Sequence, residues 1–409
     1  MFKAVAGYYK DNERLRLLVK IIAVWLISRA VMLLMVPVMN LIADEPHQWL
    51  YYMNPWDAEW YKGIVENGYQ PPKSSGMASW AFFPLYPLVC MAVRLVTMGS
   101  IDTYAVGMTV SNICIIIAVY YAVKYADIEL DMKKYNKKTV EDIIIFLMLA
   151  GPFAVYYGAM YTEALFILCV ILCFYNSARH NYMAAGIAAA MASATRIVGC
   201  MLVFVLITYM FMETCAECRA KHNSEMKDNK EAGIIDKCML TEEAGILIAG
   251  NISLASVIRT FIKNVIKEPK KLVAIMISPL GIFIYMNYLR YFCGDSWAFY
   301  HVQRAWRTQK MFPVIGVLFK SCTGQLSAAS GVKTLNGIIL GWLCVITLML
   351  YAAMIRKKHY ALGIFGIIVL LIPLTSSVMS TLRFIMGSFV IYIGCLLYTS
   401  PSPRDRSLS

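Results

Sequence analysis

Long apolar runs separated by short polar segments dominate the chain. The first run covers 21–42, and similar runs follow at 104–124, 141–159 and 164–178. An α-helix needs about 20 apolar residues to cross a bilayer, so each run predicts a membrane-spanning helix. Further spans are expected at 272–292, 335–355, 360–379 and from 384 onward. Together with the two segments discussed next, the pattern predicts about nine or ten spans.

One apolar segment, 182–212, is too long for a single simple span. Gly186, Arg196 and Gly199 interrupt it. Broken helices at membrane depth are tolerated where they line a cavity or are buried in protein. We therefore expect a hairpin of two short helices with Arg196 near its outer tip.

The segment 81–98 has two interpretations. As a span, it would turn the Lys-rich loop 124–138 to the outside, against the positive-inside rule. Pro84 and Pro87 also disfavour a regular helix start. We prefer an interfacial or re-entrant segment, and the spanning alternative stays open.

Basic residues are concentrated in short loops, and this fixes the predicted topology. The formal net charge is +13, with clusters of Lys and Arg before the first run, near 133–138 and at 356–358. Such clusters mark cytoplasmic loops. No nucleic-acid-binding signature accompanies the charge, so we expect no nucleic-acid partner. The predicted segments are a cytoplasmic N-terminus (1–20), a first outer loop (43–80), a polar cytoplasmic insert (213–271) and a second outer loop (293–334).

Composition supports an all-α polytopic integral membrane protein. The chain of 409 residues is 59% hydrophobic and 15% charged, whereas soluble domains have about 25% charged residues. The twelve cysteines show no disulfide framework, and many lie inside apolar runs as small hydrophobes. No small-residue cleavage site follows the first run, which predicts a retained helix. The end, 398–409, resembles translated sequencing adapter, so we expect the membrane domain to cover 21–397 and the native C-terminus to be missing.

This topology brings ionisable residues together on the outer face. They are Asp57 and Glu59 in the first outer loop, Glu163 at a turn, Arg196 at the hairpin tip and Arg383 at the start of the last helix. Ionisable groups at membrane depth are costly and usually functional. A carboxylate within reach of a hydroxyl is a candidate general base, and arginine forks match phosphate oxygens.

The sequence resembles a family at several of these places. The first outer loop reads WDAEWYKGIVENGY (56–69) and is followed by AFFPLYPL (81–88). Looser matches are GPFAVYYGAMYTEALF (151–166), ASATRIVGC (192–200), the segment 278–306 and LTSSVMSTLRF (374–384). These motifs are similar to those of the PIG-V-type mannosyltransferases, a family of the GT-C superfamily of membrane glycosyltransferases. The polar insert is not part of that resemblance.

The resemblance implies a catalytic acid in the first outer loop, at Asp57. It implies transfer of a hexose, most simply mannose, from a polyprenyl or dolichyl phosphate, with inversion of the anomeric carbon. Expected substrate contacts are Trp56, Trp60, Glu59, Glu163, Arg196, Gln303, Trp306 and Arg383. The acceptor is a glycolipid, polysaccharide or protein glycan, and the sequence does not choose among them.

Each of these residues also has a structural interpretation. Asp57 and Glu163 suit helix N-caps, and the tryptophans suit an aromatic belt. Arg196 suits a buried ion pair and Arg383 a snorkelling position. Gln303 and Trp306 suit an interfacial amphipathic helix.

We expect no required cofactor or resident metal. Arginine alone can bind the phosphate of a lipid monophosphate donor, so no metal is required. The alternative is a divalent ion held by Asp57 together with Asp44, Glu45 and His47. No P-loop or dinucleotide fingerprint is present in the sequence.

A transporter or flippase of lipid or glycolipid is the alternative function, since broken helices and intramembrane arginines also suit that class. The transporter would show matched halves with polar residues at midplane, whereas here the polar residues gather at one face. The expected location is the plasma membrane in a prokaryote or the endoplasmic reticulum in a eukaryote.

Overall fold

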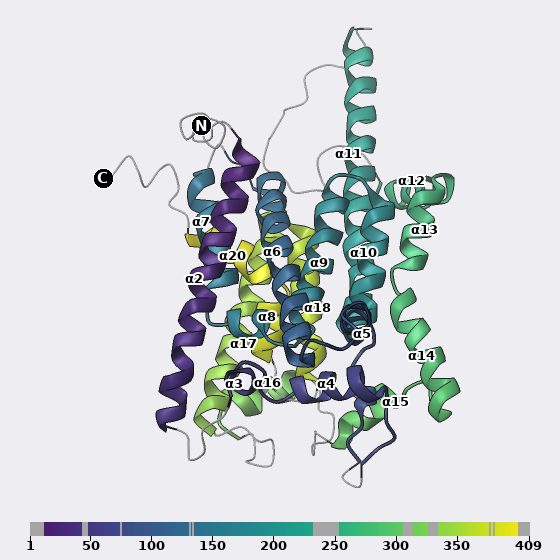
Figure 1. Ribbon diagram of the computed structural model, residues 1–409. Coiled ribbons are helices and arrows are strands. Elements are labelled where there is room, and N and C mark those ends of the chain that lie inside the picture. Colours follow the sequence, from purple (N-terminus) through teal and green to yellow (C-terminus); the bar gives the residue numbers. More distant parts are fainter. Residues whose placement is uncertain are drawn as a thin grey trace.

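The computed structural model describes residues 12–42, 48–73, 76–130, 132, 135–231, 253–305, 314–325, 334–375, 378 and 381–399. Every regular element in these ranges is a helix, as the apolar pattern predicts (Figure 1). In chain order the elements are α2 (Glu13–Ile42), α3 (Trp49–Met53), α4 (Ala58–Asn67), η1 (Ser79–Ala81), α5 (Leu85–Val96), α6 (Thr103–Glu129), α7 (Lys137–Leu149), α8 (Ala154–Gly158), α9 (Glu163–Ala178), α10 (Tyr182–Thr195), η2 (Ile197–Met201), α11 (Leu202–Glu231), α12 (Leu254–Lys267), α13 (Pro269–Ile277), α14 (Leu280–Cys293), α15 (Ala298–His301), η3 (Val302–Ala305), α16 (Val314–Cys322), α17 (Thr334–Arg356), α18 (Tyr360–Leu374), α19 (Thr381–Gly387) and α20 (Val390–Thr399).

Four helices are long and apolar enough to cross a membrane: α2, α6, the segment Ile197–Ser224 and the segment Leu335–Arg356. Two bent pairs, α13 with α14 and α19 with α20, raise the number to six if each pair is one span. The expected all-α polytopic architecture is therefore confirmed, and the chain is an integral membrane protein. The expected nine or ten spans stay a prediction, because α5, α9, α10 and α18 are apolar but shorter.

The centre of the bundle is α9, which is apolar on all sides. Most of its residues are buried, from Glu163 to Ser177, and it packs between α6 and α10. Small residues let the neighbouring helices approach closely. A Cβ on Gly281 of α14 would lie 2.3 Å from the Ala190 carbonyl oxygen of α10. Close packing of this kind joins helices in lipid, where hydrophobic burial supplies little force.

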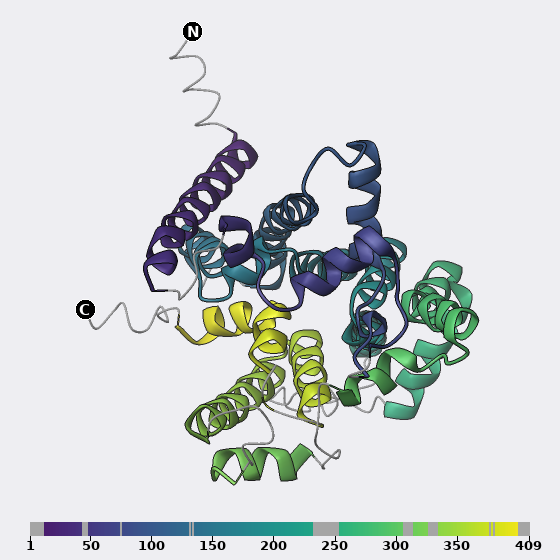
Figure 2. The ribbon, with the colours of Figure 1, turned by 60° about the horizontal axis from the view of Figure 1, so that its bottom comes forward.

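The charged helix ends gather at one end of the bundle, which we call the basic end. There Lys137 pairs with Glu13, and Lys20 pairs with Asp142. His359, at the start of α18, lies 2.7 Å from Glu129, at the end of α6. Helices α3, α4, α15 and α16 lie at the opposite end (Figures 1 and 2). The basic end corresponds to the predicted cytoplasmic side.

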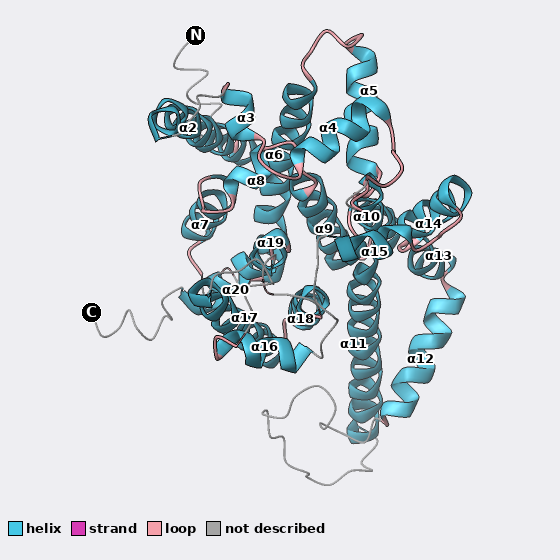
Figure 3. Cartoon of the chain, turned by 90° about the horizontal axis from the view of Figure 1, so that it is seen from below, coloured by secondary structure: helices cyan, strands magenta, loops and turns pink. Residues whose placement is uncertain are grey.

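Helix α5 crosses the bundle rather than following it. In Figure 1 it is seen nearly end-on, while α2 and α6 run vertically, and Figure 3 shows it lengthwise from below. Its twelve residues span about 18 Å, short of the roughly 30 Å hydrocarbon core. This geometry agrees with the interfacial or re-entrant interpretation of 81–98.

Several predicted boundaries differ from the structure. The expected span 141–159 is two helices, α7 and α8, separated by a turn that contains Gly151 and Pro152. The expected span 272–292 is bent by 42° between α13 and α14. The hairpin in 182–212 is present, but its second helix is not short, since α11 continues for 30 residues. Residues 400–409 of the expected non-native tail lie outside the described residues.

Candidate active site

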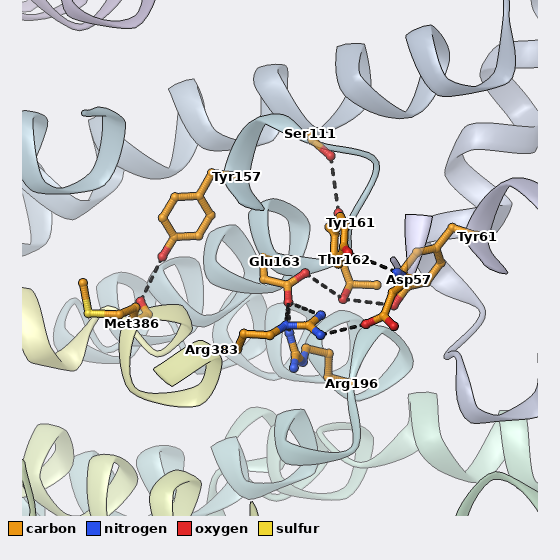
Figure 4. Close-up of polar contacts among 10 residues, drawn as sticks. All are labelled: Asp57, Tyr61, Ser111, Tyr157, Tyr161, Thr162, Glu163, Arg196, Arg383 and Met386. Carbon is orange, nitrogen blue, oxygen red and sulfur yellow. Dashed lines mark hydrogen bonds and ion pairs between the residues drawn. The ribbon is translucent and has the colours of Figure 1, made fainter. Parts of the chain in front are cut away.

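Asp57 lies at the opposite end of the bundle, directly before α4. It occupies the N-cap position, but its side chain makes no cap hydrogen bond. Instead its carboxylate accepts a hydrogen bond from Arg383 Nη1 at 2.7 Å (Figure 4). The side chain is 31% exposed, and within the described residues its second oxygen, Oδ1, accepts no hydrogen bond. The predicted N-cap position of Asp57 is therefore confirmed, but its side chain does not cap the helix, and one carboxylate oxygen is open to a ligand.

The backbone before Asp57 is held in an unusual conformation. Trp56 has a φ of +52°, which bulky residues rarely adopt outside functional sites and tight turns. The Tyr161 hydroxyl accepts a hydrogen bond from the Asp57 N–H at 3.1 Å and donates one to the Pro55 carbonyl. Tyr161 thus fixes the loop on both sides of Trp56 and sets the direction of the Asp57 side chain.

Glu163 is the central anion of the site. It is the first residue of α9 and is fully buried. Its Oε1 accepts hydrogen bonds from Arg383 Nη2 at 2.6 Å, Arg383 Nε at 2.9 Å and Arg196 Nη1 at 2.8 Å. The capping interpretation of Glu163 is wrong, because both arginines use its carboxylate.

The break between α10 and α11 places Arg196. The residue is extended, with φ −153° and ψ 146°, and the η2 turn follows it. A Cβ on Gly199 would lie 2.2 Å from the Ala192 carbonyl carbon, so glycine is needed where the turn folds back on α10. The guanidinium lies over the rings of Phe166 and Phe384, at 5.7 and 5.1 Å from their centroids. The predicted hairpin tip and the predicted buried ion pair are both confirmed.

Arg383 reaches the site from α19, which other contacts hold in place. The Tyr157 hydroxyl donates to the Met386 carbonyl at 2.9 Å and lies 3.2 Å from the Tyr392 hydroxyl. The Arg383 side chain is 23% exposed and its guanidinium is held between the carboxylates of Asp57 and Glu163, so the snorkelling interpretation is wrong. We call Asp57, Glu163, Arg196 and Arg383 the four-residue cluster; two carboxylates balance two guanidinium groups in it.

The cluster leaves donors available. Arg383 uses three N–H groups on the carboxylates, out of the five that a guanidinium carries. Arg196 uses only Nη1 for an ion pair with the residues that the structure describes. Breaking such a buried network by removing one partner typically costs about 3–5 kcal/mol, because the remaining charge stays uncompensated. The arrangement can hold a carboxylate ionised and still offer N–H groups to an anion.

The tryptophans of the first outer loop have different surroundings. Trp56 is 74% exposed and its ring stacks on Tyr156, with 6.4 Å between centroids. Arg383 lies over the same Tyr156 ring at 5.5 Å. Trp60, in contrast, is half-buried and stacks on Phe82 at 5.7 Å. The structure thus places Trp56 beside the four-residue cluster and Trp60 against the core.

The other predicted acidic residues lie outside the cluster. Glu59 accepts a hydrogen bond from the Tyr104 hydroxyl of α6. Glu66, near the end of α4, lies 3.3 Å from Arg94 and accepts a hydrogen bond from Thr103 at 2.6 Å. Both carboxylates tie α4 to neighbouring helices.

The segment 294–306 contributes no group to the cluster among its described residues. Gln303 lies half-buried in η3, and no hydrogen bond joins it to the cluster in the described part of the chain. Trp306 lies outside the described residues. His301 Nδ1 lies 2.6 Å from the carboxylate of Asp295, and this hydrogen bond holds the pKa of Asp295 below its usual value.

Sequence reasoning missed the tyrosines that support the cluster, and it missed Arg29. This arginine of α2 is buried and donates to Asn112 at 2.8 Å and to the Ala154 carbonyl at 3.1 Å. Its Nη2 has no hydrogen-bond partner among the described residues. It packs against Gly158, where a Cβ would lie 2.7 Å from its Nη1. A single arginine in the middle of the first apolar run was the available signal.

No group of three or more His, Cys, Asp or Glu suitable for a metal occurs within the ranges that the structure describes. Asp44, Glu45 and His47 of the metal alternative lie outside those ranges. The carboxylates of Asp57 and Glu163 are instead paired with arginines.

A helical membrane fold with carboxylates and arginines converging beside an exposed aromatic ring suits a membrane glycosyltransferase. The comparison with protein families agrees. Residues 15–232, more than half of the chain, match the family described as Mannosyltransferase (PIG-V). The chain therefore belongs to this mannosyltransferase family, as its motifs predict. No curated protein and no solved structure matches the chain.

Proposed function

We propose that this membrane mannosyltransferase moves mannose from a polyprenyl or dolichyl phosphate to an acceptor hydroxyl at the outer or lumenal face, with inversion. The main support is the hydrogen bond of 2.7 Å between Asp57 and Arg383, which are far apart in the sequence. The two residues meet beside Glu163 and Arg196. Family membership supports the sugar, and the cluster supports the chemistry.

Asp57 is the proposed general base. The acceptor oxygen attacks the anomeric carbon while Asp57 Oδ1 takes the hydroxyl proton. A base must lie within hydrogen-bond reach of the proton that it removes. The open oxygen of Asp57 meets this need, and the hydrogen bonds of Arg383 and Tyr161 to this residue hold its direction.

The arginines are the proposed anion site. As the new bond forms, the bond from the anomeric carbon to the phosphate oxygen breaks, and the lipid phosphate leaves as an anion. That leaving group needs positive charge more than a proton. The uncommitted N–H groups of Arg383 and Arg196 supply it, and Glu163 keeps both guanidinium groups at a fixed separation.

The Trp56 ring is the proposed platform for the mannose. It is exposed, rests on Tyr156 and adjoins both Asp57 in sequence and Arg383 in space. Trp60 packs in the core and is better explained as structural support. Glu59 and Gln303 stay weaker candidates, since within the described part of the chain no hydrogen bond or ion pair joins either of them to the cluster.

The transporter alternative is less well supported. The family to which the chain belongs is one of transferases. The described ion-pair cluster also lies toward the end opposite to the basic end, whereas a transporter site is expected near the midplane between repeats.

Labelled donors test the proposal. Purified protein in vesicles is given radiolabelled polyprenyl-phosphate mannose or nucleotide-linked mannose, together with a membrane lipid extract as acceptor source. We expect transfer only from the lipid donor, and loss of transfer with Asp57→Asn but not with the matched Glu66→Gln. Transfer from the nucleotide donor alone would overturn the proposed donor. Equal transfer by Asp57→Asn and wild type would overturn the proposed base.

A further inference from the structure

Helix α12 takes no part in the proposed reaction. Figure 1 shows it at the edge of the bundle, beside α11 and α13 at the level of the basic end, and Figure 3 shows it lengthwise from below. It lies at the far end of the bundle from α4 and the Asp57 loop. Its role therefore has to be sought in what surrounds the basic end.

One side of α12 is apolar and open. Ile258, Ile262 and Ile266 are spaced by four residues, so they form one stripe along the helix. They are 43%, 51% and 65% exposed. Val257 and Val265, in contrast, are buried against the protein. The helix thus packs on the bundle with one face and presents a separate apolar stripe outward.

A basic stripe runs beside the apolar one. Arg259, Lys263 and Lys267 have the same four-residue spacing and are all exposed, and exposed Lys270 follows. The helix itself contains no acidic residue. Apolar and basic stripes side by side are the composition of a helix that lies in the headgroup layer of a membrane.

The connections of α12 hold it at that layer. Helix α13 begins at Pro269, directly after α12, and together with α14 qualifies as a bent membrane span. On its other side Asn264 donates to Glu217 of α11 at 2.9 Å, and Phe261 lies against Phe211. A helix that ends where a span begins, and runs transverse to that span at the edge of the bundle, is placed to lie in the plane of the bilayer surface (Figures 1 and 3).

We propose that α12 is a binding surface for anionic phospholipid headgroups of the leaflet at the basic end. The isoleucine stripe enters the upper acyl region, and the basic stripe meets the phosphates. Attraction of one basic residue to an anionic surface corresponds to about a fivefold change in binding. This surface is independent of the transferase chemistry.

Site-specific photocrosslinking on the full chain tests the proposal. A benzophenone amino acid replaces Ile262 on the apolar stripe or, as control, Ser256 on the polar side. The protein is reconstituted in phosphatidylcholine vesicles that contain a minor fraction of phosphatidylglycerol, and crosslinked lipid is identified by mass spectrometry. We expect lipid adducts from position 262, enriched in phosphatidylglycerol over its share in the vesicle, and few from position 256.

Charge variants complete the test. The double change Lys263→Gln with Lys267→Gln is expected to lower the phosphatidylglycerol enrichment by about fivefold or more. The matched double change Lys73→Gln with Arg290→Gln removes two basic residues elsewhere and is expected to leave it unchanged. Adducts to protein in place of lipid at position 262 would overturn the proposal. So would lipid adducts that contain phosphatidylglycerol only in proportion to its share in the vesicle while the basic stripe is unaltered.

Discussion

Two carboxylates, Glu129 and Glu163, join helices near opposite ends of the bundle, and they have different hydrogen-bond partners. At the basic end, Glu129 of α6 accepts hydrogen bonds from Tyr125 at 3.0 Å and Tyr209 at 3.2 Å, and His359 lies 2.7 Å away. These contacts tie α6 to α11 and α18. Near the other end, Glu163 binds two arginines, and one of them continues to the partly exposed Asp57.

The two networks differ in what they leave unused. Both oxygens of Glu129 are occupied, and the hydroxyl oxygens of Tyr125 and Tyr209 lie 2.9 Å apart. The arginines around Glu163 retain free N–H groups, and Asp57 retains an open oxygen within the described structure. A satisfied network fastens helices, whereas one with spare donors and an accessible acid can also receive a ligand. The difference assigns structure to Glu129 and chemistry to the four-residue cluster.

The largest effect is expected from Glu163→Ala. Removal of this anion leaves Arg383 and Arg196 without their shared buried partner, which costs about 3–5 kcal/mol. Transfer is expected to disappear and the melting temperature in detergent to fall. Thermal unfolding followed by size-exclusion chromatography measures the stability. A variant that melts like wild type would show that the arginines do not depend on Glu163.

Arg383→Lys comes next. Lysine keeps the charge but cannot bridge Asp57 and Glu163 with a planar fork. Loss of one such preorganised donor set typically lowers the rate by about 10²–10³-fold. Initial transfer rates measure the effect, with Arg94→Lys as the matched control outside the cluster. A wild-type rate for Arg383→Lys would leave the fork without a role in transfer.

Two variants of Trp56 distinguish the role of its ring from the role of its backbone conformation. Trp56→Ala and Trp56→Gly both remove the ring, but only glycine relieves the strained φ of +52°. If the ring holds the sugar, both variants raise the KM for the lipid donor by a similar factor, about threefold to tenfold. A KM that stays normal in Trp56→Gly and rises only in Trp56→Ala would assign the effect to the backbone instead.

The smallest effect on transfer is expected at the basic end. Glu129→Gln keeps the shape but weakens bonds to a charged acceptor, which lowers stability by about 1–3 kcal/mol. The transfer rate at a temperature well below unfolding is expected to stay near that of wild type. A large loss of transfer rate in a folded Glu129→Gln protein would contradict the assignment of a purely structural role to the Glu129 network.

The sequence predicted the fold class and the residues of the cluster better than their contacts. Apolar runs indicated helices because a bilayer permits few other structures. The separate positions of Asp57, Glu163, Arg196 and Arg383 were visible as rare charges near helix ends. Their pairing was not visible, since it joins residues more than three hundred positions apart in the case of Asp57 and Arg383.

The helix breaks, and the tyrosines that support the four-residue cluster, were harder to predict from the sequence. The bend within α13–α14 and the turn between α7 and α8 occur in continuous apolar sequence, where hydropathy gives no boundary. Tyr161 and Tyr157 resemble ordinary core aromatics until their hydroxyl partners are known. The side chains of Asp57 and Glu163 do not cap their helices because partners from other helices outcompete the local backbone.

The most direct test compares Asp57→Asn with Glu129→Gln in one assay. Both variants are purified, shown to be folded by thermal unfolding, and given radiolabelled polyprenyl-phosphate mannose under single-turnover conditions. A general base contributes about 10²–10⁴-fold, so we expect a loss of that size for folded Asp57→Asn protein, and a near wild-type rate for Glu129→Gln. Equal rates for the two variants, or a slower Glu129→Gln, would contradict the assignment of the chemistry to the four-residue cluster.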